Sequence, residues 1–176
     1  MINLLVSDIE KALKEDCFFA ALTLALTLPD VCGKAEYPNK RVSERYKTWY
    51  KKYVSIYEKT DSPYSNDMPY MSEEIVYSLR NSLLHQGTPN IENNNIKEER
   101  CKVDKFSLVI TDENSCDGDI VRVSYGKNMD IVEREQNISI RHICYSLCRA
   151  AENYYINNKE KFSFINYTVI DKRKCV

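Results

Sequence analysis

The stretch CFFAALTLALTL, residues 17–28, is the longest apolar run of the chain and decides its fold class. It is apolar on nearly every side of a helix, which is typical of a central helix packed on all faces. A run of this length is too short to cross a bilayer, so we expect it to lie in a protein core. Helical periodicity extends it back to residue 3, in two pieces that meet near Asp16. Pro29 is expected to end the helix, and PDVCGKAEYPN (29–39) is expected to form a connector.

Three further stretches show helical periodicity. Residues 41–59 place tyrosines and a tryptophan three and four positions apart, which predicts a long amphipathic helix. A second helix is expected to begin at Ser72, with carboxylates in its first turn, and to run to about Gln86, where Gly87 suits the position after its end. Residues 138–158 predict the last long helix.

The pattern changes to β-strand alternation before this last helix. KFSLVI (105–110) and DIVRVSY (119–125) flank the acidic segment DENSCDG (112–118), which predicts a β-hairpin. IVERE (131–135) is a candidate third strand. We therefore predict a mainly α single domain spanning residues 1–176, with a small β-hairpin insertion at about 104–132 before the last long helix.

Composition limits the classes of function. The chain has 176 residues, of which 43% are hydrophobic, and this is enough for one domain with its own core. Its 25 Lys and Arg nearly balance its 26 Asp and Glu, so any nucleic-acid contact must be local. Seven cysteines and an N-terminus without signal-peptide features predict a cytoplasmic protein with reduced thiols and no membrane association.

The segment YSLRNSLLHQGTPN (77–90) contains one of only two histidines. On an α-helix, Asn81 and His85 share a face, whereas Arg80 lies roughly 140° away from His85. Arg80 must then reach round the helix or act on a phosphate shared with another subunit. An imidazole that moves protons beside a guanidinium that binds phosphoryl oxygens suits phosphodiester cleavage by an RNA 2′-OH, which needs no metal.

The hexapeptide RNSLLH (80–85) matches the R-x4-H motif of the HEPN superfamily of helical-bundle ribonucleases. ALTLALTLPDVCGKAEYPN (21–39) and RYKTWY (45–50) resemble a group of uncharacterised bacterial and phage HEPN-like proteins. The resemblance extends over most of the chain, including HQGTPN (85–90) and KEKFSFINY (159–167).

This resemblance implies a HEPN-like four- or five-helix bundle that forms a two-fold homodimer. Arg80 and His85 of both subunits would then form one composite cleft, in which each Arg80 faces the other subunit's His85. Family members cut RNA without metal or cofactor, usually in toxin–antitoxin, abortive-infection or CRISPR-linked defence. The implied protein is a metal-independent endoribonuclease with an RNA substrate and an antitoxin or regulator protein as a further partner. The β insertion departs from the minimal bundle.

The implied roles are general acid and base for His85, phosphate binding for Arg80 and positioning of either group for Asn81. A structural alternative stays open, in which Arg80 pairs with Glu73 or Glu74 and His85 only complements the helix dipole. HEPN folds also include inactive versions, and the alternative function is a module that binds a protein or a nucleotide.

Residues 34–59 contain eight Lys and Arg against three Glu, with aromatic residues between them. This composition favours RNA contact by Lys34, Arg41 and Arg45. The alternative is that the aromatic rings belong to the core and the cations to a solvated face.

Two carboxylates of the expected connector, Asp30 and Glu36, are candidates to orient His85 or Arg80 as the third member of a relay. The alternative is that they cap helices or pair with Lys34.

We expect no metal and no cofactor. His142, Cys144 and Cys148 lack a fourth ligand at a recognisable spacing, and we expect them to pack in the core. The acidic segment DENSCDGD (112–119) lacks the alternating ligands and the terminal Glu of a calcium loop.

Overall fold

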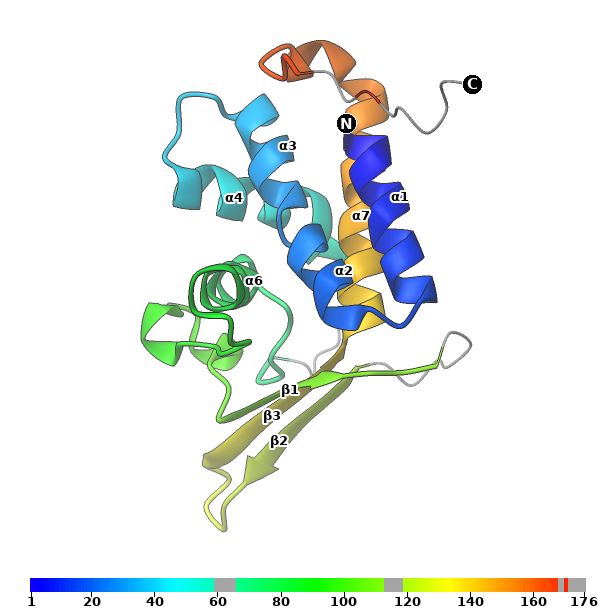
Figure 1. Ribbon diagram of the computed structural model, residues 1–176. Helices are drawn as coiled ribbons and strands as arrows, with labels where there is room; N and C mark the ends of the chain where they lie inside the picture. Colours follow the sequence, from blue (N-terminus) through cyan, green and yellow to red (C-terminus); the bar gives the residue numbers. More distant parts are fainter. Residues whose placement is uncertain (59–65, 113–118, 168–169, 171–176) are drawn as a thin grey trace.

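A computed structural model describes residues 1–58, 66–112, 119–167 and 170. The chain is mainly helical, with a small three-stranded sheet below the helices in Figure 1. The helices are α1 (Ile2–Lys14), α2 (Phe18–Ala25), α3 (Leu28–Glu36), α4 (Val42–Tyr50), α5 (Ile56–Glu58), α6 (Glu73–Asn81) and α7 (Ile140–Asn157). Two π-helical turns, Lys51–Ser55 and Ser82–Gln86, continue α4 and α6. The strands are β1 (Lys105–Val109), β2 (Ile120–Tyr125) and β3 (Ile131–Ser139).

Helix α7 is the central helix of the fold, and α1, α2 and α3 all pack against it (Figure 1). Its buried side chains recur at helical spacing, as in Ile143, Leu147, Ala151 and Tyr154. Since these positions share one stripe, α7 buries that stripe against the three N-terminal helices. The predicted helix over 138–158 is confirmed, with its first residue at Ile140.

The prediction for the N-terminal helices is partly wrong. The break near Asp16 is confirmed, because Asp16 has a φ of +56° between α1 and α2. A second break follows Ala25, however, and Pro29 begins α3 instead of ending a helix. Proline is well tolerated in a first helical turn, where its missing N–H has no intrahelical partner. The expected connector 29–39 is therefore helical up to Glu36.

Residues Phe18–Glu36 together are long and apolar enough, by length and composition, to cross a membrane. Half of this stretch is buried inside the fold, and buried core helices meet the same criterion. It consists of α2 and α3, both of which contact α7. The stretch therefore carries no assignment beyond its place in the core.

The helix after Ser72 follows the sequence prediction closely. The Ser72 hydroxyl accepts a hydrogen bond from the backbone N–H of Ile75 at 3.3 Å, as an N-cap does. Gly87 ends the helix with a φ of +70°, a left-handed conformation that glycine adopts without steric cost. Helix 41–59 is also confirmed as far as Glu58, although its second half contains the π-helical turn.

The predicted hairpin is wrong in its pairing. The strand order is β1-β3-β2, with β3 antiparallel to β2 and parallel to β1. The hairpin joins β2 to β3 through the tight turn Gly126–Asp130, where the Gly126 N–H donates to the Asp130 carbonyl at 2.7 Å. A turn of this length closes a hairpin at lower entropic cost than the longer acidic segment. Residues 113–118 of that segment lie outside the described residues.

Candidate active site on helices α3, α4 and α6

Arg80 lies at the centre of a cluster of polar side chains from two helices and a π-helical turn. Its Nε and Nη2 both donate to Oδ2 of Asp30, at 3.0 and 2.9 Å. Its Nη1 donates to Oδ1 of Asn81 at 3.0 Å and lies 3.1 Å from Nε2 of His85. Four residues that the sequence singled out for chemistry are therefore in direct contact: Asp30, Arg80, Asn81 and His85.

The π-helical turn explains why Arg80 reaches His85 within one chain. An α-helix separates residues five positions apart by roughly 140°, which was the basis of the sequence expectation. A π-helix closes i→i+5 hydrogen bonds and so brings such residues closer to the same face. Because α6 changes to π geometry at Ser82, His85 moves to the side that Arg80 occupies. Of the two expected arrangements, the structure shows the one in which Arg80 reaches His85 within its own chain, and the π-helical turn shortens that reach.

Asp30 holds the guanidinium from below the exposed surface of the cluster. The side chains of Asp30 and Arg80 are only 18% and 16% exposed. Burial raises the pKa of Asp30, and the positive charges of Arg80 and Arg45 oppose this shift without cancelling it. Oδ1 of Asp30 is buried and has no hydrogen-bond partner among the described residues. The carboxylate is therefore held by one oxygen only.

Arg45 of α4 adds a second positive charge beside Asp30. Its Nε is buried and has no hydrogen-bond partner in the described parts of the chain. The close packing of α3 on α4 depends on Gly33, because a Cβ at that position would lie 2.9 Å from the backbone oxygen of Arg45. Gly33 thus allows the approach that brings Arg45 to Asp30.

The cluster is open to solvent on the side of His85, which is exposed, and closed on the side of Asp30. In the observed arrangement Nε2 of His85 can accept a hydrogen bond from Nη1 of Arg80, which requires the tautomer that carries its proton on Nδ1. Arg80 can exchange these contacts for phosphate oxygens while Asp30 keeps hold of Nε and Nη2. The arrangement can therefore bind an anion and leave a free imidazole nitrogen next to it.

Three other predicted residues lie outside this cluster. Lys34 donates from Nζ to the backbone oxygen of Pro38 at 3.3 Å, and Arg41 is exposed just before α4. Glu36 faces a different set of partners at the far end of α3. Of the predicted RNA-binding residues, only Arg45 adjoins the cluster.

The alternative in which Arg80 forms a structural ion pair with Glu73 or Glu74 is wrong. Glu73 pairs with Lys51 at 2.9 Å, and Glu74 accepts a hydrogen bond from the backbone N–H of Lys97. Arg80 is paired with Asp30 of α3 instead, fifty residues earlier in the chain.

Glu36 is the centre of a second charged network. Its carboxylate accepts hydrogen bonds from Lys52 and Tyr53 on one oxygen and from Tyr154 and Lys161 on the other, at 2.6–3.2 Å. Burial alone would raise the pKa of Glu36, but these hydrogen bonds outweigh it and lower the pKa to about 2. Glu36 therefore joins α3, α7 and the π-helical turn after α4, and does not orient Arg80.

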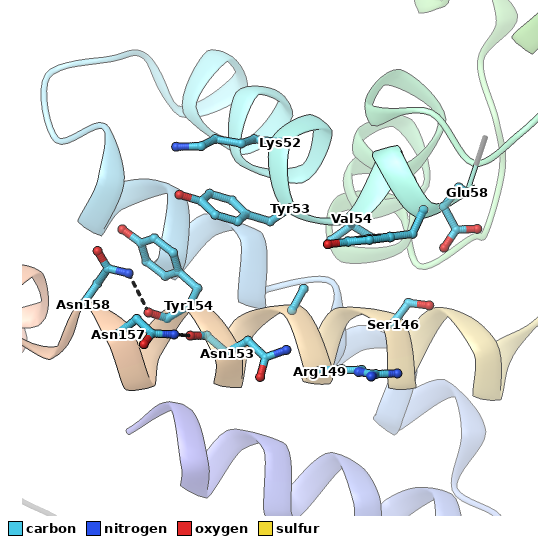
Figure 2. A pocket seen from close by; sticks show the side chains of 12 residues that line it. Lys52, Tyr53, Val54, Glu58, Ser146, Arg149, Asn153, Tyr154, Asn157 and Asn158 are labelled. Atoms are coloured by element: carbon cyan, nitrogen blue, oxygen red, sulfur yellow. Dashed lines mark hydrogen bonds between the residues drawn. The ribbon is translucent and has the colours of Figure 1, made fainter. Parts of the chain in front are cut away.

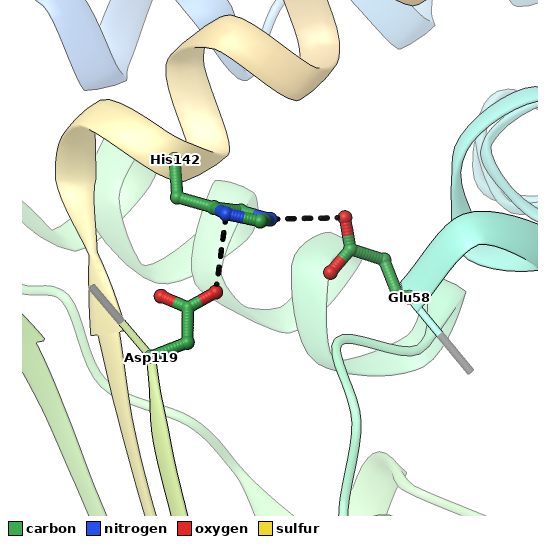
Figure 3. A group of neighbouring side chains, drawn as sticks. All are labelled: Glu58, Asp119 and His142. Carbon is green, nitrogen blue, oxygen red and sulfur yellow. Dashed lines mark hydrogen bonds and ion pairs between the residues drawn. The ribbon is translucent and has the colours of Figure 1, made fainter. Parts of the chain in front are cut away.

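The expectation that His142 packs in the core is wrong, because its side chain is exposed and faces two carboxylates (Figure 3). Its Nε2 lies 3.3 Å from Glu58, and its Nδ1 lies 3.3 Å from Asp119. The hydrogen bond to Glu58 raises the pKa of His142, and the charge of Asp119 adds to the effect. Because a metal ion would bind a single ring nitrogen, and the carboxylates face opposite nitrogens, the contacts fit a protonated imidazole between two carboxylates.

The cysteines near His142 are packed as expected. Cys144 and Cys148 are both buried on α7, and burial raises the pKa of each thiol to about 12. Protonated, buried thiols behave as small apolar side chains.

No protein-family model matches this chain, and no curated protein or solved structure matches it either. Membership of the HEPN superfamily therefore remains a prediction from the RNSLLH motif. What can be inferred about function depends on the geometry of the Arg80 cluster.

Proposed function

We propose that the protein is a metal-independent endoribonuclease whose site is the cluster of Asp30, Arg80, Asn81 and His85. The observation that carries this proposal is the 3.1 Å contact between Nη1 of Arg80 and Nε2 of His85 on the open side of the cluster. A group that binds phosphate thus lies beside a group that transfers protons. The RNSLLH motif, and the HEPN-like bundle and homodimer that it implies, support the same function.

Phosphate binding begins at Arg80. Asp30 holds Nε and Nη2, so the guanidinium plane is set before RNA arrives, and Nη1 turns from Asn81 and His85 to a phosphoryl oxygen. Charge-assisted hydrogen bonds of this kind strengthen as negative charge develops on the phosphoryl group.

Proton transfer falls to His85. Once Arg80 binds phosphate, Nε2 of His85 is free to take the proton of the adjacent 2′-OH. The 2′ oxygen then forms a bond to phosphorus, and the bond from phosphorus to the 5′ oxygen breaks. The products are a 2′,3′-cyclic phosphate and a 5′-hydroxyl that has gained a proton. In a two-fold homodimer, two such clusters would share one cleft, and the second His85 would supply that proton.

The test compares wild-type protein with His85→Ala on a mixed-sequence RNA in EDTA. General acid–base catalysis contributes about 10²–10⁴-fold, so we expect His85→Ala to lose at least about a hundredfold in cleavage rate. His142→Ala is the matched control, because it removes the other histidine, whose partners are Glu58 and Asp119. Wild-type products should end in 2′,3′-cyclic phosphates. Equal cleavage by wild type and His85→Ala would refute the assignment.

One observation favours a second candidate function. Arg80 already has partners for Nε, Nη1 and Nη2 within its own chain, as a purely structural arginine would. An inactive bundle that binds a protein or a nucleotide would keep the cluster intact. That function predicts that wild-type protein leaves RNA uncut while it binds such a partner.

A further inference from the structure

A cavity of about 610 Å³ lies between helix α7 and the segment Lys52–Glu58 (Figure 2). Its volume is within the range of about 300–1,000 Å³ that is usual for small-molecule sites. It shares no residue with the Arg80 cluster, and α7 contributes none of the residues of that cluster. The cavity is therefore a second candidate site, and its function is independent of the one proposed above.

The two walls of the cavity differ in chemistry. On one side lie the rings of Tyr53 and Tyr57. The ring of Tyr53 already packs against Lys52, Trp49 and Tyr154, whereas the ring of Tyr57 is exposed and provides flat aromatic surface. On the other side α7 presents Ser146, Arg149 and Asn153, which are three, four and seven positions apart and so share one face of the helix. A ligand that fills the space would have a flat apolar face and polar, negatively charged edges.

The polar wall offers groups that the protein itself does not use. Arg149 has neither an ion pair nor a hydrogen bond within the described parts of the chain, and the side chains of Asn153 and Ser146 are likewise without partners there. By contrast, Lys52 at the edge of the cavity is bound to Glu36 at 3.1 Å, and Glu58 faces His142. The unpaired positive charge of the cavity is thus on Arg149.

We propose that this cavity binds a nucleoside phosphate, with the base against Tyr57, the phosphate on Arg149 and the base edge on Asn153. Stacking on an aromatic ring is available to every base, whereas an unpaired guanidinium is suited to phosphate oxygens. An amide offers both a donor and an acceptor to the edge of a base. The ligand is either a free nucleotide or one nucleotide of an RNA strand, since the two share this chemistry.

The only tryptophan of the chain provides the measurement. Trp49 is fully buried, and its ring centroid lies 5.3 Å from that of Tyr53 and 5.9 Å from that of Tyr154, both of which line the cavity. We would titrate the full-length protein with AMP and, separately, with a six-nucleotide RNA, and follow Trp49 fluorescence. We expect a saturable change with a Kd below about 1 mM for at least one of the two probes.

Substitutions in the cavity test whether the change in Trp49 fluorescence arises from binding there. Arg149→Gln should weaken binding about tenfold, since it removes the charge-assisted hydrogen bonds to the phosphate oxygens. Lys14→Gln, which removes an equal charge from the exposed end of α1, should bind like wild type. Tyr57→Ala should also weaken binding, and its ring is 81% exposed, so the fold does not depend on it.

Each outcome decides the proposal. Binding of AMP would show that a free nucleotide is enough to occupy the cavity. Binding of the RNA but not of AMP would show that the cavity is a subsite for an RNA strand. The proposal is overturned if neither probe gives a saturable change, or if Arg149→Gln binds like wild type. RNA cleavage is measured in parallel: His85→Ala should lose cleavage but change its Trp49 fluorescence with the binding probe as wild type does, so failure of one proposal leaves the other distinguishable.

Discussion

Asp30 and Glu36 are two carboxylates on the same short helix, and their pKa values are shifted in opposite directions. They are six residues apart on α3, or about 9 Å along its axis. Glu36 uses both oxygens, and its hydrogen bonds lower its pKa to about 2. Asp30 uses one oxygen, and burial raises its pKa even beside Arg80.

The difference fits a structural network around Glu36 and the proposed active site around Asp30. Both oxygens of Glu36 accept hydrogen bonds that join α3 to other elements, and the ionised form of Glu36 stabilises the fold. The charge of Asp30 orients the guanidinium of Arg80, and it contributes little to the stability of the fold. A buried carboxyl group with a shifted pKa beside a specific charged partner is a candidate for a functional site, and Asp30 beside Arg80 is such a group.

Among the substitutions that test this comparison, Asp30→Asn should have the largest effect, and that effect is on the rate of RNA cleavage. The amide keeps the size of the side chain but removes the charge that orients Arg80, and misplacement of a catalytic group by about 1 Å can cost about a hundredfold in rate. We expect RNA cleavage to fall about 10- to 100-fold while the variant stays folded, because the amide oxygen of Asn can still accept hydrogen bonds from Nε and Nη2 of Arg80. Cleavage assays and urea unfolding on the same preparation check both statements. A stable, fully active variant would remove Asp30 from the site.

The converse substitution, Glu36→Gln, should reduce stability without touching the Arg80 cluster. The loss of the charged acceptor for Lys161 and Lys52 should lower the free energy of unfolding by about 2 kcal/mol. Urea unfolding at pH 7 measures this loss. Unchanged stability would show that the network around Glu36 contributes nothing to the fold.

Gly33→Ala tests the helix packing that both carboxylates share. Its Cβ would lie 2.9 Å from the backbone oxygen of Arg45, so α3 and α4 must separate. We expect a loss of about 1.5 kcal/mol in stability, in the range of overpacked substitutions. A crystal structure of the variant should show Arg45 displaced from Asp30. If stability and the position of Arg45 are both unchanged, Gly33 does not set this distance.

As the pH falls, the contributions of the two carboxylates to the free energy of unfolding should change in opposite directions. The lowered pKa of Glu36 means that its contribution is complete above about pH 4.5 and is lost as the pH falls towards 2. The stability gap between wild type and Glu36→Gln should therefore close over that interval. For Asp30, whose pKa is raised, wild type should instead gain stability relative to Asp30→Asn as the pH falls. Parallel stability curves for all three proteins would contradict both assignments.

The smallest effect concerns His142, which has carboxylate partners where His85 has an arginine. Its raised pKa means that the ion pairs with Glu58 and Asp119 contribute fully below about pH 6.5 and are lost as the pH rises through the folded value. Since the side chain is 43% exposed, we expect less than about 1 kcal/mol. The melting temperature of His142→Gln, measured from pH 6 to pH 9, should converge on that of wild type.

Short-range sequence signals predicted the helix ends, which depend on interactions within one helical turn. Ser72 and Gly87 mark the ends of the motif helix because an N-cap and a left-handed C′ residue act within one turn. The π-helical turn at Ser82 was not predictable, because a 3.6-residue period assumes the hydrogen bonding that this turn changes. Pro29 was misread because proline both ends helices and begins them.

Contacts between distant residues explain the remaining differences. The pairing of β1 with β3 and the contact of His142 with Glu58, 84 residues away, depend on the whole fold. The members of the Arg80 cluster were predictable from residue types, because Asp30, Asn81 and His85 all contact Arg80. The separation of Asp30 from Glu36 was not, because both lie on a helix that the sequence indicated as a connector.

The central position of α7 has a consequence for synthesis on the ribosome. Helices α1, α2 and α3 emerge first, but the helix that they pack against ends about 120 residues after Glu36. At about 5–20 residues per second, the apolar faces of these helices wait about 6–24 s for their partner. During that interval the nascent chain is a substrate for holdase chaperones, and a chain released before residue 140 should aggregate.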